Sequence, residues 1–273
     1  MKTERVVKDA PYAARNDMPN SGLGFARIDA RAPRSGTIRF TRLRSRPALA
    51  ADEIHVYSFD LDSPRWRADA VLELLAPDEV ARADRYRVPD HGRRFLAARA
   101  ALREILAAYA RVEARDVSFV YGDYGKPFLD RGSELGRIRF NSSRSSRWGL
   151  VAIRRDEDVG VDVERIRPFP KSLEIARRFF SEFEWHALQL APDAERDRRF
   201  FEYWTRKEAI VKSLGKGLSH PLSAFTVSSA SCEIVDVADH DIDGSPAGRL
   251  TVWALRPSPG YVAALATRCL ARP

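Results

Sequence analysis

Apolar and polar side chains follow two different periods along the chain from residue 53 onward. Alternation at every second position, the period of a β-strand, marks residues 53–60, 117–122, 137–141 and 148–153. Apolar side chains at every third or fourth position, the period of an amphipathic helix, mark residues 66–75, 77–86 and 91–110. This part of the chain therefore predicts helices together with short strands.

The second part of the chain repeats this order in outline. The helical period marks residues 172–181, 182–190 and 195–215. Strand patterns follow at residues 224–229, 232–237, 249–255 and 261–267. We therefore predict an α+β fold of two similar half-domains, related by a pseudo-twofold axis, each with helices packed on a small antiparallel sheet.

Three ranges divide the chain. Residues 1–51 mix Arg, Pro, Ser, Gly and Asn with little periodicity, and predict an N-terminal extension that is flexible or loosely packed. Residues 52–165 form the predicted N-terminal half of the folded domain, and residues 166–273 form its C-terminal half. The polar sequence at 141–146 lies between two predicted strands, and is expected to be a loop rich in hydrogen-bond donors.

Composition argues against several classes of protein. The 273 residues are 44% hydrophobic and 31% charged, which is typical of a soluble globular protein with a substantial core. No apolar run approaches the roughly 20 residues of a membrane span, and the N-terminus lacks the apolar stretch of a signal peptide. We therefore expect a cytoplasmic protein without membrane contact. Cys232 and Cys269 are not closely spaced, and the five histidines give no His-x-x-x-His pair, which argues against a zinc site.

The chain carries a formal net charge of +8, and most of its positive charge comes from arginine. Such a balance favours anionic partners, namely phosphorylated ligands, nucleic acid or acidic protein surfaces. Solvated surface arginines would account for the same excess equally well. Charge alone therefore does not choose a function.

The sequence Asp-Val-Gly-Val-Asp-Val-Glu at 158–164 places two carboxylates in an otherwise apolar strand. Successive strand residues point to opposite faces, so the three valines share one face while Asp162 and Glu164 share the other. Their α-carbons would lie roughly 7 Å apart, close enough to repel unless a positive charge lies between them. A bound cation would supply that charge, and so would salt bridges to Arg165 and Arg167 or simple exposure to water.

A third carboxylate follows in the helix predicted at 195–215, where Glu208 and Lys212 are one turn apart. Taken alone, they suit an ordinary Glu–Lys pair on a helix surface. Together with the two strand carboxylates, Glu208 would provide oxygen ligands of the type that Mg²⁺ prefers beside phosphate oxygens. Lys207 and Lys212 flank Glu208 and could neutralise phosphate, so the set suits phosphoryl chemistry.

Further basic residues lie in positions suited to anions. Arg82, Arg85 and Arg94 surround a predicted helix junction, and Lys126 precedes Pro127 in a turn, although an ordinary turn explains that sequence as well.

The chain has no Gly-x-Gly-x-x-Gly, no complete P-loop and no Gly-x-Ser-x-Gly. A covalent serine mechanism therefore has no support.

The ordered set Tyr-Gly-Lys-Pro, Phe-Asn-Ser-Ser-Arg-Ser-Ser, Gly-Val-Asp-Val-Glu, Phe-Phe and Tyr-Trp-Thr-Arg-Lys-Glu-Ala-Ile-Val-Lys-Ser-Leu-Gly-Lys-Gly-Leu resembles the Sfp-type 4′-phosphopantetheinyl transferases. The resemblance extends over about residues 53–265. It implies a cytoplasmic monomer that binds coenzyme A between its halves, without nucleic acid. Its reaction would move the 4′-phosphopantetheine arm onto a serine of an acyl- or peptidyl-carrier protein, and release adenosine 3′,5′-bisphosphate. A role in secondary-metabolite biosynthesis is expected with it.

The resemblance also implies roles for individual residues. Asp162, Glu164 and Glu208 match the ligands of Mg²⁺, with Mn²⁺ as the alternative metal. Glu208 and Lys212 match catalytic positions: either Glu208 or a metal-bound water would deprotonate the carrier serine, and Lys212 would contact the pyrophosphate. Positions that match contacts to coenzyme A are Arg82, Arg85, Arg94, Lys126, Pro127, Ser143, Arg144, Lys207 and Lys212.

One position departs from the family pattern. Arg144 stands where family members usually have a histidine that touches phosphate. Arginine keeps a positive charge and forked donors but cannot exchange a proton near neutral pH. We therefore expect phosphate binding to survive with a changed affinity. Two alternatives stay open at this point: a homologue that binds coenzyme A without transfer, and a nucleic-acid-associated protein whose acidic cluster is structural or nucleolytic.

Overall fold

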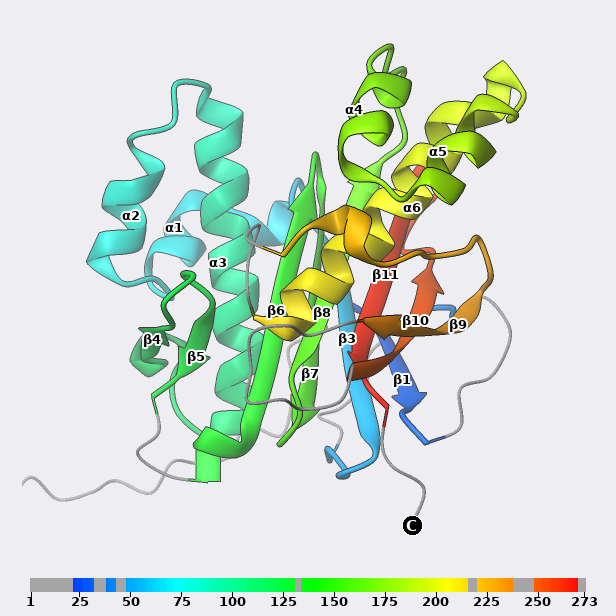
Figure 1. Cartoon of the computed structure of the whole chain (residues 1–273). Coiled ribbons are helices and arrows are strands. Elements are labelled where there is room, and N and C mark those ends of the chain that lie inside the picture. Colours follow the sequence, from blue (N-terminus) through cyan, green and yellow to red (C-terminus); the bar gives the residue numbers. More distant parts are fainter. Residues whose placement is uncertain are drawn as a thin grey trace, which may run out of the picture.

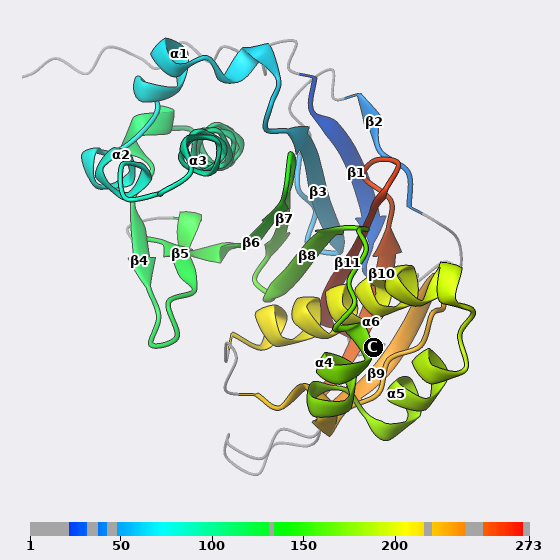
Figure 2. The same cartoon turned by 90° about the horizontal axis from the view of Figure 1, so that it is seen from above.

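Two antiparallel sheets lie face to face between helices, so the molecule has four layers (Figure 2). One apolar cluster joins the facing sides of the two sheets, and a further cluster on each outer side joins a sheet to its helices. This computed structural model describes residues 22–31, 38–42, 48–130, 134–215, 220–237 and 248–269.

The first sheet has the strand order β2-β1-β3-β7-β6, labelled in Figure 2; Figure 1 shows the molecule turned by 90° from that view. Its strands are β1 (Gly24–Asp29), β2 (Thr41–Arg42), β3 (Glu53–Asp60), β6 (Ile138–Ser145) and β7 (Trp148–Arg155). Its helices are α1 (Ala68–Leu72), α2 (Pro77–Ala83) and α3 (Pro89–Ala110), with 3₁₀ turns η1 (Pro64–Trp66), η2 (Ala114–Asp116) and η3 (Glu134–Arg137). β4 (Phe119–Tyr121) and β5 (Pro127–Leu129) form a separate, small antiparallel hairpin.

The second sheet has the strand order β8-β11-β10-β9. Its strands are β8 (Val159–Arg165), β9 (Cys232–Val237), β10 (Gly248–Leu255) and β11 (Tyr261–Arg268). Its helices are α4 (Ser172–Phe179), α5 (Glu182–Gln189) and α6 (Asp193–Leu214), and a 3₁₀ turn η5 (Leu222–Ala224) follows them. None of the helices that the structure describes is long and apolar enough to cross a membrane.

Side-chain periodicity explains how these layers assemble. In β8 the alternating valines Val159, Val161 and Val163 are buried in the cluster between the sheets. In β11 the alternate positions Val262 and Ala264 are buried in the cluster beneath α6. Because both faces of the second sheet are covered, its inner strands are apolar on both sides. The predicted α+β class with two antiparallel sheets is confirmed.

Strand β1, within the predicted N-terminal extension, is a regular paired strand and not the flexible or loosely packed segment expected there. β1 pairs with β3 over six residue pairs, and its Ala26 and Ile28 are buried. Ala26 and Ile28 alternate as in a strand, but two positions are too few to predict one from sequence, and β1 depends on the long β3 beside it for hydrogen bonds. Residues 1–21 of the predicted extension lie outside the described residues.

Two further details differ from the sequence-based expectation. The strand expected at 224–229 is instead η5 followed by an irregular segment. The polar sequence at 141–146, expected to be a loop, is mostly part of β6. The two sheets divide between β7 and β8, because β8 pairs with β11. The assignment of 52–165 and 166–273 to two half-domains stays a prediction.

Candidate active site

Helix α6 lies directly on strand β8, and Gly160 allows this approach. A β-carbon built at Gly160 would lie 2.0 Å from the carbonyl oxygen of Ala209 and 2.4 Å from the amide nitrogen of Ser213. Both are backbone atoms of α6, so a larger residue has no space. The close approach brings Lys212 of α6 against Asp162 of β8.

Asp162 is the best-connected carboxylate of this cluster. Its Oδ1 accepts hydrogen bonds from Ser143 Oγ at 2.7 Å and from Lys212 Nζ at 2.6 Å. Its Oδ2 is buried and has no hydrogen-bond partner among the described residues. A buried carboxylate oxygen without a partner is costly. This oxygen is therefore free to bind a ligand.

Glu208 lies one helical turn before Lys212 and carries a second buried oxygen of this kind. Its Oε1 has no hydrogen-bond partner in the described structure. Burial raises the pKa of Glu208, and the negative charge of Asp162 raises it further, while Lys212 opposes the shift. The carboxyl group would therefore gain from a nearby cation.

Glu164 completes the set of three carboxylates. Its Oε2 accepts a hydrogen bond from Ser145 Oγ at 2.6 Å and lies 3.7 Å from Arg167 Nη1. Burial raises the pKa of Glu164; the hydrogen bond from Ser145 lowers it, and the charge of Asp162 raises it. The three carboxyl groups therefore sense one another's charge.

The donor set fits a hard divalent cation such as Mg²⁺, which prefers carboxylate oxygens. Two of those oxygens, on Asp162 and Glu208, are buried without a partner. Across the residues that the structure describes, no three His, Cys, Asp or Glu side chains already converge as a metal site. Lys212 is instead the cation against Asp162. The residues present fit the metal in type and burial.

A cavity of about 390 Å³ opens beside these carboxylates. Its walls come from α2, α3, β6 and the turn between β4 and β5. Its lining includes five residues predicted to contact coenzyme A, of which Lys212 was also predicted to be catalytic: Arg82, Pro127, Ser143, Arg144 and Lys212. The structure therefore brings these predicted residues together.

Arg144 is held in this cavity by aromatic neighbours that the sequence analysis did not single out. Its Nη2 donates a hydrogen bond to the hydroxyl of Tyr86 at 3.1 Å, and its guanidinium lies 5.8 Å from the ring centre of Phe95. Arg82 lies 5.2 Å from the same ring. Cation–π contacts of this kind fix arginines without neutralising them. Both guanidinium groups therefore remain available to an anion.

The prediction that Lys207 contacts coenzyme A is wrong, because its side chain is buried away from the cavity. Its side chain is completely buried, with Nζ 2.8 Å from Glu184 and within hydrogen-bond distance of two backbone carbonyls, those of Leu222 and Phe225. Glu184 is equally buried and also accepts the amide of Val227. Lys207 and Glu208 are adjacent on a helix, so their side chains point in different directions.

Replacing Lys207 with methionine is expected to destabilise the protein by about 3–5 kcal/mol, because it leaves the charge of Glu184 buried and unpaired. Urea unfolding measures this loss. The double variant Lys207→Met with Glu184→Gln should recover part of the stability, since no buried charge then remains. Unchanged stability with weaker coenzyme A binding would contradict the structural role.

Three other predicted residues lie apart from the carboxylates or are already paired. Lys126 Nζ contacts Asp158 Oδ1 at 3.1 Å and the carbonyl oxygen of Lys212 at 3.0 Å, and its burial lowers its pKa. Arg94 makes a two-pronged contact with Asp62, and Arg85 is exposed outside the lining of the cavity. Their contact with coenzyme A stays a prediction.

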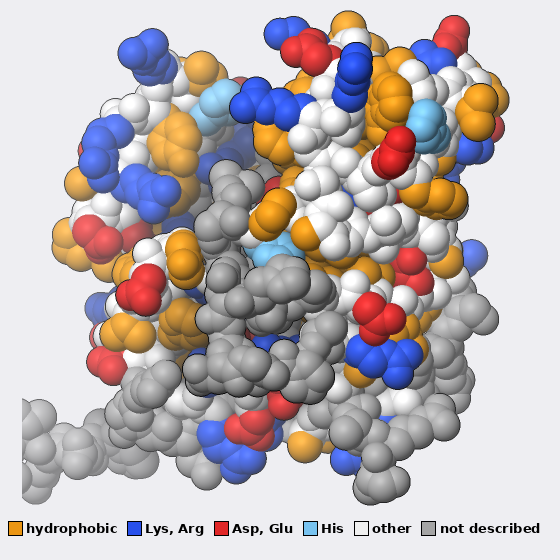
Figure 3. Space-filling view, viewed as in Figure 1, with side chains coloured by type: hydrophobic (Ala, Val, Ile, Leu, Met, Phe, Trp, Pro, Cys, Tyr) orange, Lys and Arg blue, Asp and Glu red, His pale blue; other side chains and the backbone are white. Residues whose placement is uncertain are grey.

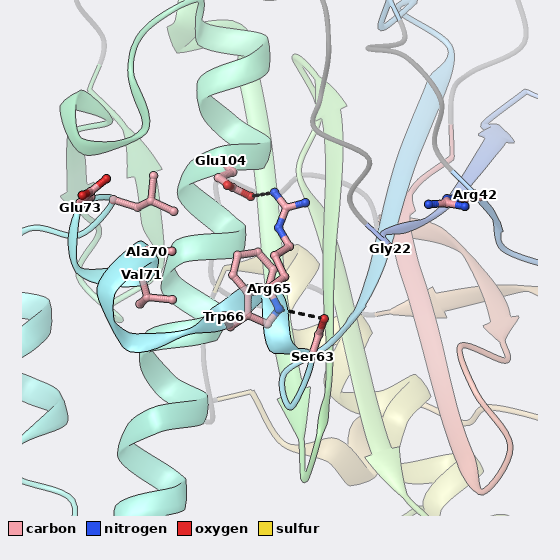
Figure 4. A pocket seen from close by; sticks show the side chains of 10 residues that line it. Gly22, Arg42, Ser63, Arg65, Trp66, Ala70, Val71, Glu73 and Glu104 are labelled. Atoms are coloured by element: carbon pink, nitrogen blue, oxygen red, sulfur yellow. Dashed lines mark hydrogen bonds and ion pairs between the residues drawn. The ribbon is translucent and has the colours of Figure 1, made fainter.

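A larger cavity of about 580 Å³ lies in the first half, between η1, α1 and α3 (Figure 4). Arg65 and Glu104 form an ion pair across it, and Trp66 forms part of its wall. Because Arg65 and Glu104 already neutralise each other, they offer less chemistry than the carboxylate cluster. Size alone therefore does not identify the site.

A family model and individual relatives of known name point to the same family. Residues 158–266 match a family model described as the 4′-phosphopantetheinyl transferase superfamily. The chain is similar to the 4′-phosphopantetheinyl transferase HetI of Nostoc sp. (strain PCC 7120), with 40% identity over 172 residues, covering 63% of this chain and 72% of HetI. It is also similar to Sfp of Bacillus subtilis (strain 168), with 30% identity over 174 residues, covering 63% of this chain and 75% of Sfp.

Proposed function

Since this chain belongs to the 4′-phosphopantetheinyl transferase superfamily, we propose that its carboxylate cluster and the cavity beside it are the active site. As a member of that family, the protein transfers the 4′-phosphopantetheine arm of coenzyme A to carrier proteins. The observation that carries the proposal is the pair of buried oxygens on Asp162 and Glu208 that have no partner among the described residues, next to a cavity lined by Arg82 and Arg144.

In the proposed site Asp162, Glu164 and Glu208 hold Mg²⁺, with Mn²⁺ as the alternative. The chemistry that the metal supplies when bound is neutralisation of charge on the pyrophosphate of coenzyme A. Asp162 Oδ2 and Glu208 Oε1 are buried and have no hydrogen-bond partner in the described part of the chain. Ser143 donates to the other oxygen of Asp162, and Ser145 donates to Oε2 of Glu164.

Basic side chains bind the phosphates in this proposal. Arg82 and Arg144 line the cavity, each near the ring of Phe95, and offer forked donors to phosphate oxygens. Lys212 exchanges Asp162 for the pyrophosphate when the substrate binds, and stabilises charge on the leaving phosphate. Adenosine 3′,5′-bisphosphate leaves.

Glu208 accepts the proton of the attacking carrier serine in the proposed mechanism. Its raised pKa brings the carboxylate closer to the basicity that a general base needs near neutral pH. The serine oxygen then attacks the β-phosphorus of coenzyme A, and the bond to the leaving bisphosphate breaks.

The proposed docking surface for the carrier is formed by α4 and α5. Figure 3 shows basic and hydrophobic side chains side by side over these two helices, at the top of the molecule. Phe179 and Phe183 are exposed there, together with Lys171, Arg177 and Arg178. An acidic acyl- or peptidyl-carrier domain would be attracted to this surface in a salt-dependent way.

We place the protein in the cytoplasm, as a monomer that serves secondary-metabolite biosynthesis.

Incubation with coenzyme A, Mg²⁺ and an apo carrier protein, followed by intact mass measurement, tests this function. The expected result is a mass gain of one phosphopantetheine arm, which is lost when EDTA removes the metal and restored by Mg²⁺ or Mn²⁺. No gain on any member of a panel of acyl and peptidyl carriers would refute transfer. Coenzyme A binding without transfer would identify an inactive homologue.

Changing Arg144 to histidine is expected to retain or raise activity. Imidazole donors can still contact phosphate, so kcat/KM for coenzyme A should stay within about tenfold of wild type. Arg144→Ala removes the contact altogether and should lower kcat/KM by about 10- to 100-fold, as expected for a hydrogen bond to a charged group. A severe loss in Arg144→His would contradict the phosphate-binding role.

A further inference from the structure

Strand β8 lies at the edge of the second sheet, next to β6 at the edge of the first. An edge strand leaves backbone N–H groups without a ladder partner, and buried ones need another acceptor. In β8 the amides in question belong to Val161, Val163 and Arg165. Each donates to a side chain of β6 and not to its backbone.

The acceptors follow a strict alternation along β6. Val161 N donates to Asn141 Oδ1 at 2.9 Å, and Val163 N donates to Ser143 Oγ at 3.4 Å. Arg165 N donates to Ser145 Oγ at 3.2 Å. Each pair is separated by 20 residues, so the register between the two strands is constant. We call Asn141, Ser143 and Ser145 the β6 seam.

The two serines of the β6 seam each make a second hydrogen bond, to a carboxylate of the proposed metal site. Ser143 Oγ donates to Asp162 Oδ1 at 2.7 Å, and Ser145 Oγ donates to Glu164 Oε2 at 2.6 Å. A serine hydroxyl has one donor and two lone pairs. With its proton on the carboxylate and a lone pair on the next amide, each hydroxyl has a fixed orientation.

We propose that Ser145 and Ser143 are positioning residues, which fix the orientation of Glu164 and Asp162 for metal binding. This inference rests on the proposed function, because it takes the two carboxylates as metal ligands. The β6 seam then couples assembly of the metal site to docking of the two sheets. Ser143 acts through Asp162, and because it also lines the cavity, its predicted contact with coenzyme A stays a prediction.

Ser145 is the more sensitive position of the two. Asp162 keeps a second close partner, Lys212, when Ser143 is removed. Among the residues that the structure describes, the other partner of the Glu164 carboxylate is Arg167, at a longer distance of 3.7 Å. Groups that orient metal ligands typically change metal affinity by about 10- to 100-fold when they are removed. We therefore expect the larger effect at Ser145.

The test measures Mn²⁺ binding to the full chain by electron paramagnetic resonance, and transfer kinetics as a function of Mn²⁺. Ser145→Ala should raise the Mn²⁺ dissociation constant by about tenfold or more, with kcat at saturating Mn²⁺ close to wild type. Ser145→Thr keeps the hydroxyl and should restore the affinity. Ser118→Ala, at an exposed serine before β4, is the matched control and should change neither quantity.

Hydrogen exchange of the Arg165 amide in metal-free protein provides a second measurement. Ser145→Ala should speed this exchange, because the amide loses its acceptor, and Ser118→Ala should not. An unchanged exchange rate of the Arg165 amide in Ser145→Ala would refute the hydrogen bond from that amide to the β6 seam. An unchanged Mn²⁺ affinity in Ser145→Ala, beside a weakened one in Asp162→Asn, would overturn the positioning role alone. An unchanged affinity in Asp162→Asn would instead refute the metal assignment of the proposed function.

Discussion

Replacing Asp162 with asparagine is expected to abolish transfer while the fold stays intact. The amide keeps the size of the side chain but removes the charge that Lys212 contacts at 2.6 Å and the buried Oδ2 proposed to bind the metal. Loss of a preorganised electrostatic group of this kind costs about 10²- to 10³-fold in kcat, and loss of a metal ligand adds to it. The rate of phosphopantetheine transfer, followed by intact mass, measures the effect.

Two further variants accompany this experiment: one tests the second carboxylate, and the other is a control. Glu208→Gln removes the other unpartnered carboxylate and should lower the rate to a similar extent. Asp193→Asn, at an exposed position in the first turn of α6, is the matched control and should leave the rate unchanged. Thermal unfolding checks that all three variants are folded. Turnover at the wild-type rate in Asp162→Asn would refute its role in the site.

Replacing Gly160 with alanine is expected to displace α6, and so to reduce both stability and activity. The new β-carbon would lie 2.0 Å and 2.4 Å from backbone atoms of α6, which cannot rotate away as a side chain could. Overpacking typically costs about 1–3 kcal/mol, and we expect at least the upper end here because the whole helix must shift. Glu208 and Lys212 would move with it, so transfer should fall as well.

Urea unfolding and the transfer assay measure these two effects. Gly248→Ala is the matched control, because a β-carbon at Gly248 has no neighbour within 4 Å. That variant should keep wild-type stability and activity. If Gly160→Ala behaved in the same way, the close approach of α6 to β8 would not be what assembles the site.

The sequence predicted the carboxylate cluster because strand and helix periods each fix which side chains share a face. Asp162 and Glu164 lie on the same side of β8, and Glu208 precedes Lys212 by one turn of α6, as their spacing indicated. The resemblance to a family joined these separate patterns into one site. Gly160 was part of the same motif, but only its contact with α6 explains why the position requires glycine.

Other expectations failed because local pattern does not determine the partner of a side chain. Lys207 and Lys212 both flank Glu208 in the sequence and were both predicted to bind phosphate. The ammonium group of Lys207 is nevertheless buried against Glu184. The polar sequence at 141–146 was expected to be a loop, because a strand edge covered by another strand is not visible from sequence. The alternation of Asn141, Ser143 and Ser145 was the signal that could have predicted the β6 seam.

The sequence by itself determined the α+β class, the order of most helices and strands, and the types of residue available for phosphoryl transfer. Those properties depend on periods and spacings within one segment. The tertiary structure alone decided which of the basic residues face the cavity, and which carboxylate oxygens remain without a partner. These depend on contacts between segments far apart in the chain, such as β6 with β8 and α5 with α6, and no local pattern specifies such contacts.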